Sequence, residues 1–474
     1  MSALPPYPAY KPTAIPWLQQ VPEHWEFLPF SAIARIKSVT GQVQRQLLSV
    51  YLNRGVIPFT DVAEKRTNVT SEDLSRYQAV DPGDFVLNNQ QAWRGSVGVS
   101  KHSGIVSPAY LVLTLSDRVN PDYANTLFRQ QLMVDQYMVC SKGVGSIQRN
   151  LYWPSLRRVS VLLPPVEEQA LIVRYLHALD AKVKRYIRAK RNLIARLQEQ
   201  KQAIIQRAVT RGLDPNVKLK SSGVEWLGEV PEHWEVVRLR TAFLSVDSGV
   251  WGVDVEREDD EDNVYCMRAA DFDMQTYSLN PAKRILRKVN VFDRKRKSLI
   301  KGDLLLEKSG GGDAVPVGRV VYADGALPMV FSNFLTRLRP DQRRFDAKYL
   351  LYLLNTLHGS RVILADIKQT TGLQNLDERA YLGRTILMPK LDEQRLIVAQ
   401  LDRDFEKVNQ AMTIVQRDIQ LMQEYHTRLI ADVVTGAVDL RAAAQALAED
   451  QMIGRSDDQM TVEEIETELN EETE

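Results

Sequence analysis

Residues 17–26 read WLQQVPEHWE and residues 226–235 read WLGEVPEHWE, so eight of the ten positions are identical. A second pair of blocks, EQALIVRYL at 168–176 and EQRLIVAQL at 393–401, shares six of nine positions. The members of the two pairs lie 209 and 225 positions apart. A repeat of roughly 200 residues corresponds to two whole domains in series, because solenoid repeats are far shorter. The sequence therefore predicts a tandem duplication.

A long amphipathic pattern follows each EQ block. Apolar residues recur at steps of three, four and seven from Ile172 to Ala208 and from Ile397 to Val433, which is typical of a coiled-coil seam. His426 is the one residue that interrupts the second seam. Some 45 helical residues span roughly 65–70 Å, more than a small domain covers. We therefore expect the two helices to pack on each other, antiparallel because a complete domain connects them.

The segments between these helices have a mixed α/β pattern. GDFVLNN (83–89) and GDLLLEK (302–308) predict a turn followed by a strand, and SPAYLVLTL (107–115) and SNFLTRLRP (332–340) predict further strands. Short helices are expected in residues 121–138 and 346–364. The predicted fold class is mixed α/β, with two similar α+β domains separated by two long antiparallel coiled-coil helices.

The domain boundaries follow from these patterns. The expected segments are a Pro-rich tail (1–16), a first globular domain (17–163), a first helix (164–212), a second globular domain (213–388), a second helix (389–436) and a C-terminal extension with an acidic, disordered tail (437–474).

The net charge of +1 hides a strong asymmetry. Residues 449–474 hold eleven acids and one base, so residues 1–448 carry a net charge of +11. Residues 157–214 contain thirteen Lys/Arg against five Asp/Glu, and residues 283–301 contain nine against one. A basic body indicates a polyanionic partner, and we expect nucleic acid. Competition of the acidic tail for the basic surface is a further hypothesis.

Several classes of protein are disfavoured by the composition. Cys140 and Cys266 show no CxxC spacing and the six histidines show no HExxH pattern, which argues against a disulfide scaffold or a metal site and fits the cytoplasm. No run of about 18 apolar residues predicts a membrane span. The loop KSGGGDAVPVG (308–318) lacks the GK[ST] ending of a nucleotide-binding P-loop.

An enzyme is the first competing interpretation. A DNA amino-methyltransferase should carry an [DNS]PP[YF] motif, but the one PPY (5–7) follows leucine in the Pro-rich tail. A nuclease with dispersed acidic ligands stays open, as does a coiled-coil scaffold that binds only proteins.

The block SSGVEWLGEVPEHWEVVRLR (221–240) resembles the opening of a recognition unit in the specificity subunits of Type I restriction–modification systems. PPVEEQALIV (164–173) and PKLDEQRLIV (389–398) resemble the helix starts of that family. YQAVDPGDFVLNNQQAWRGSVGVS (77–100) and GIVSPAYLVL (104–113) resemble its target-recognition domain. The resemblance covers nearly the whole chain, apart from the first dozen residues and the acidic tail.

The resemblance implies two target-recognition domains that each read one half of a split, asymmetric DNA site, with the helices setting the gap. It implies no catalytic centre and no cofactor in this chain. It also implies that the chain docks two modification subunits, which use S-adenosylmethionine to methylate adenine, and joins restriction subunits that use ATP and Mg²⁺.

Base reading requires amides for adenine and Arg or Lys for guanine. We expect two loops in each repeat to supply them. The first loop leaves the GDFVL or GDLLL strand, and its equivalents are 219 positions apart. The second loop, KGVGSIQRN (142–150) or KQTTGLQN (368–375), contains glycine and one lysine. The predicted DNA-binding residues are Asn88, Asn89, Gln90, Gln91, Arg94, Lys142, Gln148 and Arg149 in the first repeat and Lys308, Ser309, Lys368, Gln374 and Asn375 in the second.

The repeated aromatic residues have a different predicted role. Trp17, Trp25, Trp226 and Trp234 recur in both halves, which favours a framework that anchors each repeat against the helix ends. His24 and His233 are expected to be structural for the same reason. The cluster RKRK (294–297) either contacts phosphates or balances the acidic run DVEREDDED (254–262).

Overall fold

The computed structural model describes residues 4–15, 18–52, 54–61, 73–143, 149–224, 226–256, 262–280, 282, 284–312, 315–325, 328–370 and 373–447. They form two compact units. Unit 1 holds the described residues up to Arg188 and from Ile419 onward, and unit 2 holds those of Ala189–Asp418. Each long helix is divided between the two units, so the units do not coincide with the predicted domains. The predicted domain boundaries therefore remain a prediction.

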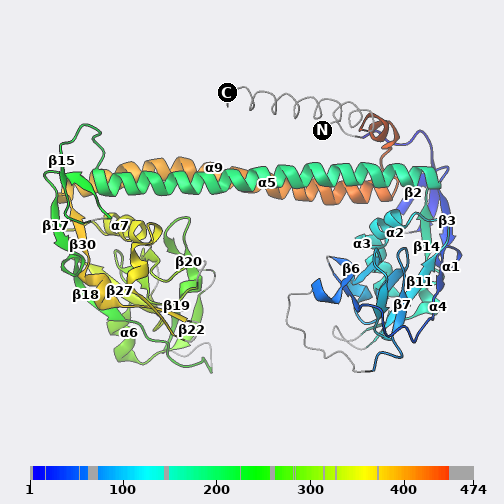
Figure 1. The fold of residues 1–474 in the computed structure, drawn as a ribbon, viewed down its shortest axis with the longest axis horizontal. Helices are drawn as coiled ribbons and strands as arrows, with labels where there is room; N and C mark the ends of the chain where they lie inside the picture. The colour runs from blue at the N-terminus through cyan, green and yellow to red at the C-terminus, as the bar shows by residue number, and fades with distance from the viewer. Residues whose placement is uncertain are drawn as a thin grey trace, which may run out of the picture. The chain divides into compact units, whose positions relative to one another are not determined.

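Unit 1 is built around an antiparallel four-stranded sheet of order β4-β11-β8-β9, of which β11 is labelled in Figure 1. The strands are β4 (Ala34–Ile36), β11 (Tyr110–Leu115), β8 (Phe85–Asn88) and β9 (Val97–Val99). The rings of Phe30, Phe85 and Phe128 pack together in its core. The helix expected at 121–138 is two helices, α2 (Pro121–Phe128) and α3 (Gln131–Val139), with Gln130 in extended backbone geometry between them.

Smaller elements surround this sheet. They are the strand pairs β1 (Tyr10–Ile15) with β2 (Leu18–Pro22), β3 (Glu26–Pro29) with β14 (Ser160–Leu163), β5 (Leu48–Tyr51) with β6 (Gly55–Pro58), β7 (Gln78–Val80) with β10 (Gly104–Val106) and β12 (Ser141–Lys142) with β13 (Asn150–Leu151), together with α1 (Phe30–Ile33), α4 (Trp153–Leu156), η1 (Phe59–Asp61) and η2 (Ala92–Arg94).

Unit 2 has a larger sheet of order β18-β27-β23-β25-β21-β20. Its strands are β18 (Phe243–Ser248), β27 (Leu335–Pro340), β23 (Leu304–Glu307), β25 (Val320–Tyr322), β21 (Ser278–Leu279) and β20 (Phe272–Asp273). The smaller strand pairs are β15 (Leu219–Ser221) with β16 (Glu229–Pro231) and β17 (Glu235–Arg238) with β30 (Thr385–Met388). Further sheets are formed by β22 (Ile285–Lys288), β19 (Asn263–Met267) and β26 (Met329–Phe331), and by β24 (Ser309–Gly310), β29 (Leu373–Leu376) and β28 (Ile367–Thr370). The helices are α6 (Val291–Lys297), α7 (Ala347–Gly359), α8 (Glu378–Gly383), η3 (Leu239–Ala242), η4 (Ala269–Asp271) and η6 (Val362–Asp366).

The long helices are α5 (Val166–Arg211) and α9 (Leu391–Val434). In unit 1, residues early in α5, such as Ile172 and Leu176, share a core with Val433, late in α9. In unit 2, Ile205, late in α5, shares a core with Leu401, early in α9. Early residues meet late ones in both units, so the helices are antiparallel within each unit, as predicted. Of the neighbouring residues Ile204 and Ile205, Ile205 is fully buried and Ile204 is partly buried.

The two repeated sequence blocks meet in each unit. The Trp25 indole N–H donates to the Glu168 carboxylate (3.1 Å), and His24 Nε2 lies 2.7 Å from the same group. Trp234 and His233 contact Glu393 in the same way, both at 2.9 Å.

A glutamine follows each of these glutamates and fixes the start of the helix. Gln169 Nε2 donates to the Pro164 carbonyl, and Gln394 Nε2 donates to that of Pro389, both at 2.9 Å. The PEHWE and EQ blocks therefore form one framework at the start of each long helix. Trp226 packs against the core of unit 2, and Trp17 lies outside the described residues.

The chain that follows α9 packs on unit 1. Residues 441–447 are helical, and Leu440 and Ala444 are buried in the core of unit 1. The predicted acidic tail begins beyond this segment and lies outside the described residues. Within the described part of the chain, no helix has both the length and the apolar character needed to cross a membrane.

Candidate nucleic-acid interface

The first predicted loop of unit 1 leaves β8 as a tight turn. Gln91 N–H donates to the Asn88 carbonyl (3.0 Å), and Gln90 N–H donates to the Asn88 side-chain oxygen (3.2 Å). The turn continues into η2, and Gly95 caps the C-terminal end of this helix. Gly95 has a φ of 93°, a conformation that favours glycine. Asn88 thus stabilises the turn, while the side chain of Gln90 is exposed.

The second predicted loop of unit 1 lies against the first. β12 pairs with β13 at Lys142 and Asn150, and Leu151 N–H donates to the Asn89 carbonyl (3.0 Å). The Lys142 ammonium lies 3.9 Å from the centre of the Tyr152 ring. The structure therefore brings both predicted loops of the first repeat together, although Gln148 lies outside the described residues.

The same arrangement recurs in unit 2. Strand β29 pairs with β24 at Asn375 and Ser309, and with β28 at Asn375 and Lys368. Leu376 N–H donates to the Lys308 carbonyl (2.8 Å), which matches the bond between Leu151 and Asn89 in unit 1. All five residues predicted in the second repeat thus belong to this sheet or adjoin it.

The predicted side chains of unit 2 differ in their hydrogen bonds and in their burial. Lys308 Nζ donates to Ser248 Oγ (2.7 Å), and Ser309 Oγ donates to Asn375 Oδ1 (2.7 Å). Gln374 is only 6% exposed and its side-chain oxygen accepts from Val317 N–H (3.3 Å). Gln374 therefore stabilises the neighbouring loop and does not present an amide edge to solvent.

An ion pair holds Lys368 at the edge of this sheet. Its ammonium lies 2.7 Å from the Asp377 carboxylate, and this hydrogen bond, first among the causes, lowers the pKa of Asp377. Lys368 itself is exposed. An exposed pair of this kind contributes little to stability, so the lysine is available to exchange its partner for a phosphate.

Sequence reasoning did not predict the burial of one acid in this region. Glu307 is the last residue of β23, at the position equivalent to Asn88, and is 2% exposed. Arg319 donates two hydrogen bonds to its carboxylate, at 2.7 and 2.8 Å. These bonds, the largest cause, raise the pKa of Arg319. An offset of 219 aligns Glu307 with Asn88, but a local pattern does not indicate that the acid is buried.

The cluster RKRK (294–297) forms the last four residues of α6. Arg294 pairs with Asp262 (3.6 Å), which supports charge balance at that residue. Lys295 and Arg296 are exposed, so phosphate contact stays open for these two. Residues 257–261 of the acidic run lie outside the described residues.

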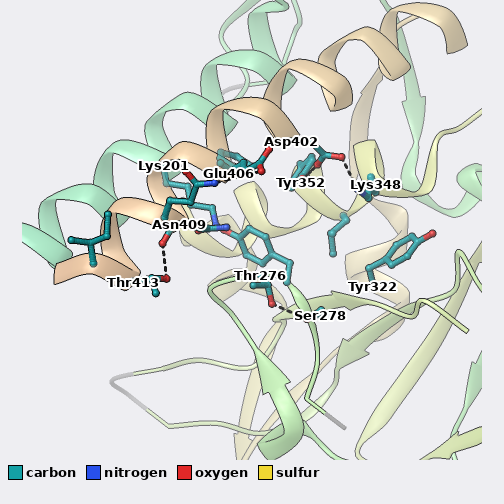
Figure 2. A pocket seen from close by; sticks show the side chains of 15 residues that line it. Lys201, Thr276, Ser278, Tyr322, Lys348, Tyr352, Asp402, Glu406, Asn409 and Thr413 are labelled. Atoms are coloured by element: carbon teal, nitrogen blue, oxygen red, sulfur yellow. Dashed lines mark hydrogen bonds and ion pairs between the residues drawn. The ribbon is translucent and has the colours of Figure 1, made fainter. Parts of the chain in front are cut away.

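A pocket of about 800 Å³ lies in unit 2 where the helices meet the globular domain (Figure 2). Tyr352, from α7, donates to Asp402 of α9 (2.7 Å), and Lys348 pairs with the same carboxylate (2.6 Å). Lys201, from α5, lies 4.7 Å from the Phe405 ring centre, and burial lowers its pKa to about 8. The pocket therefore belongs to the junction with the helices and contains none of the predicted DNA-binding residues.

Within the described ranges, no group of three or more His, Cys, Asp or Glu residues is placed to hold a metal ion. The paired loops instead present amide, guanidinium and ammonium groups, which suit base edges and phosphates.

Comparison with known proteins agrees with this chemistry. Residues 22–195 match the family described as the Type I restriction modification DNA specificity domain. The chain is 21% identical over 422 residues to the Type I restriction enzyme StySPI specificity subunit of Salmonella potsdam, covering 84% of this chain and 87% of that protein. It is also 21% identical over 439 residues to the MjaVIII specificity subunit of Methanocaldococcus jannaschii, covering 89% and 95%.

A solved structure supports the fold. It is titled as the structural basis of complex assembly and conformational transition of the type I R-M system, and it aligns with a TM-score of 0.60 at 16% identity, over 87% of this chain and 98% of that chain. The fold is that of a duplicated protein whose two units each contain part of both long helices. The family match and the curated relatives confirm the resemblance to Type I restriction–modification specificity subunits that was found in the sequence.

Proposed function

We propose that each unit reads one half of a bipartite, asymmetric DNA site and that α5 and α9 set the spacing between the halves. In this proposal the chain has no catalytic centre. It directs adenine methylation and restriction by partner subunits, which supply the sites for S-adenosylmethionine, ATP and Mg²⁺.

The observation that carries the proposal is one framework with two sets of side chains. The backbone bond from Leu151 to Asn89 has its counterpart in the bond from Leu376 to Lys308. The predicted side chains on this frame are asparagine, glutamine, arginine and lysine in unit 1 but lysine, serine, asparagine and a buried glutamine in unit 2. Two different base sequences require this combination, because donors and acceptors at the base edges specify the sequence.

Exposed apolar residues on the long helices support docking of the modification subunits. Leu396 and Ile414 are 65% and 62% exposed, and Leu193, Leu421 and Tyr425 are also exposed. A solvated helix face normally carries polar residues there. We infer that helices of the partner subunits cover these side chains.

Copurification of the tagged chain with its modification subunit tests this docking. The wild-type chain should retain the partner, and the double variant Ile414→Asp, Leu421→Asp should lose it. The variant Thr413→Asp, Gln420→Asp adds the same charge at exposed polar sites next to these positions and should retain the partner. Equal retention by both double variants would contradict docking on this face.

DNA binding by the assembled complex separates this function from that of a protein-only scaffold. We expect binding that weakens with salt, since phosphate contacts release counterions, and that discriminates between sequences. A complex that binds no DNA would favour the scaffold.

A further inference from the structure

Trp93 occupies the centre of the paired loops in unit 1. The Arg94 guanidinium carbon lies 4.6 Å from the centre of its ring, and that of Arg149 lies 5.8 Å away. The two arginines come from different loops, because Arg94 ends η2 and Arg149 precedes β13. One indole therefore contacts cationic groups of both predicted loops.

The indole is held in place by the protein itself. Its N–H donates to the Gln90 carbonyl (3.0 Å), so the polar edge of the ring is satisfied within the turn. Ala92, one residue earlier, is fully buried and anchors η2. Trp93 is only partly buried, which leaves ring surface for the arginines.

A guanidinium that stacks on an aromatic ring loses less conformational freedom when it binds, because its plane is already oriented. Arginine is the side chain that recognises guanine O6 and N7 with two parallel hydrogen bonds. Arg94 is exposed, so its donor edge is accessible from solvent.

We propose that Trp93 is a positioning residue that orients Arg94 to read a guanine in the half-site of unit 1. This inference rests on the proposed function. It is specific to unit 1, because the position equivalent to Trp93 in the second repeat is Gly312. Unit 2 therefore has no aromatic platform at this point of its turn.

The test is long-read methylation sequencing of cells that carry the complete restriction–modification gene set with variants of this chain. Arg94→Ala should relax one guanine position in one half of the split motif. Trp93→Ala should relax the same position, with a loss of roughly 10- to 100-fold in discrimination. Trp93→Phe should retain most of the discrimination because it keeps a ring. Arg158→Ala removes an exposed arginine outside the paired loops and should leave the motif unchanged.

Three results would overturn the inference. They are an unchanged motif in Trp93→Ala and Arg94→Ala, relaxation at a position other than guanine, or a uniform fall in methylation at all sites with no change of motif. Failure of the proposed function is recognised separately, since the wild-type chain would then produce no split motif. Copurification of each variant with the modification subunit confirms that it folds.

Discussion

At the scale of single residues, one carboxylate in each unit joins the two repeated sequence blocks. Glu168 is 5% exposed and accepts hydrogen bonds from Trp25 and from the Tyr7 hydroxyl (2.6 Å). Burial and this bond to Glu168 raise the pKa of Tyr7. Glu393 is more exposed than Glu168, and its hydrogen-bond partners are His233 and Trp234.

Glu168→Ala should therefore destabilise unit 1 more than Glu393→Ala destabilises unit 2. Removing Glu168 leaves buried Trp25 and Tyr7 donors without an acceptor, which costs about 2–4 kcal/mol, against about 1 kcal/mol for Glu393. Urea denaturation measures both. Glu167→Ala, an exposed neighbour in the same helical turn, is the control and should change little. An effect of Glu393→Ala as large as that of Glu168→Ala would contradict this assignment.

The residue scale also marks the limit of prediction from sequence. The recurrence of Trp25 and Trp234 in the two halves correctly indicated a framework role for these residues. The burial of Gln374 could not be predicted, because it depends on the separate loop that carries Val317. The same holds for the turns that follow β8 and β23. Their residues can be selected from the sequence, but their contacts with the second loop cannot, because that loop lies more than fifty positions further along the chain.

At the scale of elements, the seam between α5 and α9 is interrupted at equivalent positions. Lys201 and His426 are 225 positions apart, the same offset as the EQ blocks. Lys201 contacts Phe405 in unit 2, and His426 lies 3.8 Å from Asp180, the repeat equivalent of Phe405, in unit 1. The apolar pattern of the sequence identified only His426 as an interruption of the seam. Subtracting the repeat offset of 225 positions from His426 identifies Lys201 as the equivalent residue in α5. Polar seam residues specify helix register at a cost in stability.

Lys201 gives unit 2 a pH-dependent stability. Burial is the largest cause that lowers its pKa, to about 8 from 10.5, while Asp273 opposes the shift. A lysine with a lowered pKa in the folded state penalises folding while it is protonated, so the penalty is complete below pH 8 and fades as the pH rises to 10.5. Lys201→Met should remove this slope and stabilise the protein by about 1–2 kcal/mol at pH 7.

Thermal unfolding of the wild type and of Lys201→Met between pH 7 and 10.5 measures the effect. Lys190→Met is the control, because Lys190 belongs to the same helix but pairs with Asp418 (2.8 Å). Parallel pH curves for the wild type and Lys201→Met would show that the buried amine carries no such penalty.

At the scale of the whole chain, the first and the last described segments contact each other within unit 1. Asp439 N–H donates to the Pro5 carbonyl (2.7 Å), and the Tyr10 hydroxyl donates to the Ala437 carbonyl (3.2 Å). In unit 2 the chain continues from α5 to β15 without a break. The predicted C-terminal extension therefore has a structural first part, 437–447, which composition did not separate from the acidic tail.

Truncation tests this division of the extension. Removing residues 448–474 should leave the stability of unit 1 unchanged, whereas removing 437–474 should lower it by about 3 kcal/mol, because the buried side chains of Leu440 and Ala444 are lost. Equal stability of the two truncated chains, measured by urea denaturation, would contradict a structural role for 437–447.

Long-read methylation sequencing of the source cells, with and without this gene, tests whether the two units read two halves of one DNA site. We expect a split motif with a fixed gap that loses adenine methylation when the gene is removed and regains it when the gene is restored. A split motif whose methylation persists without the gene, or a continuous motif that depends on the gene, would show that the two units do not read a bipartite site.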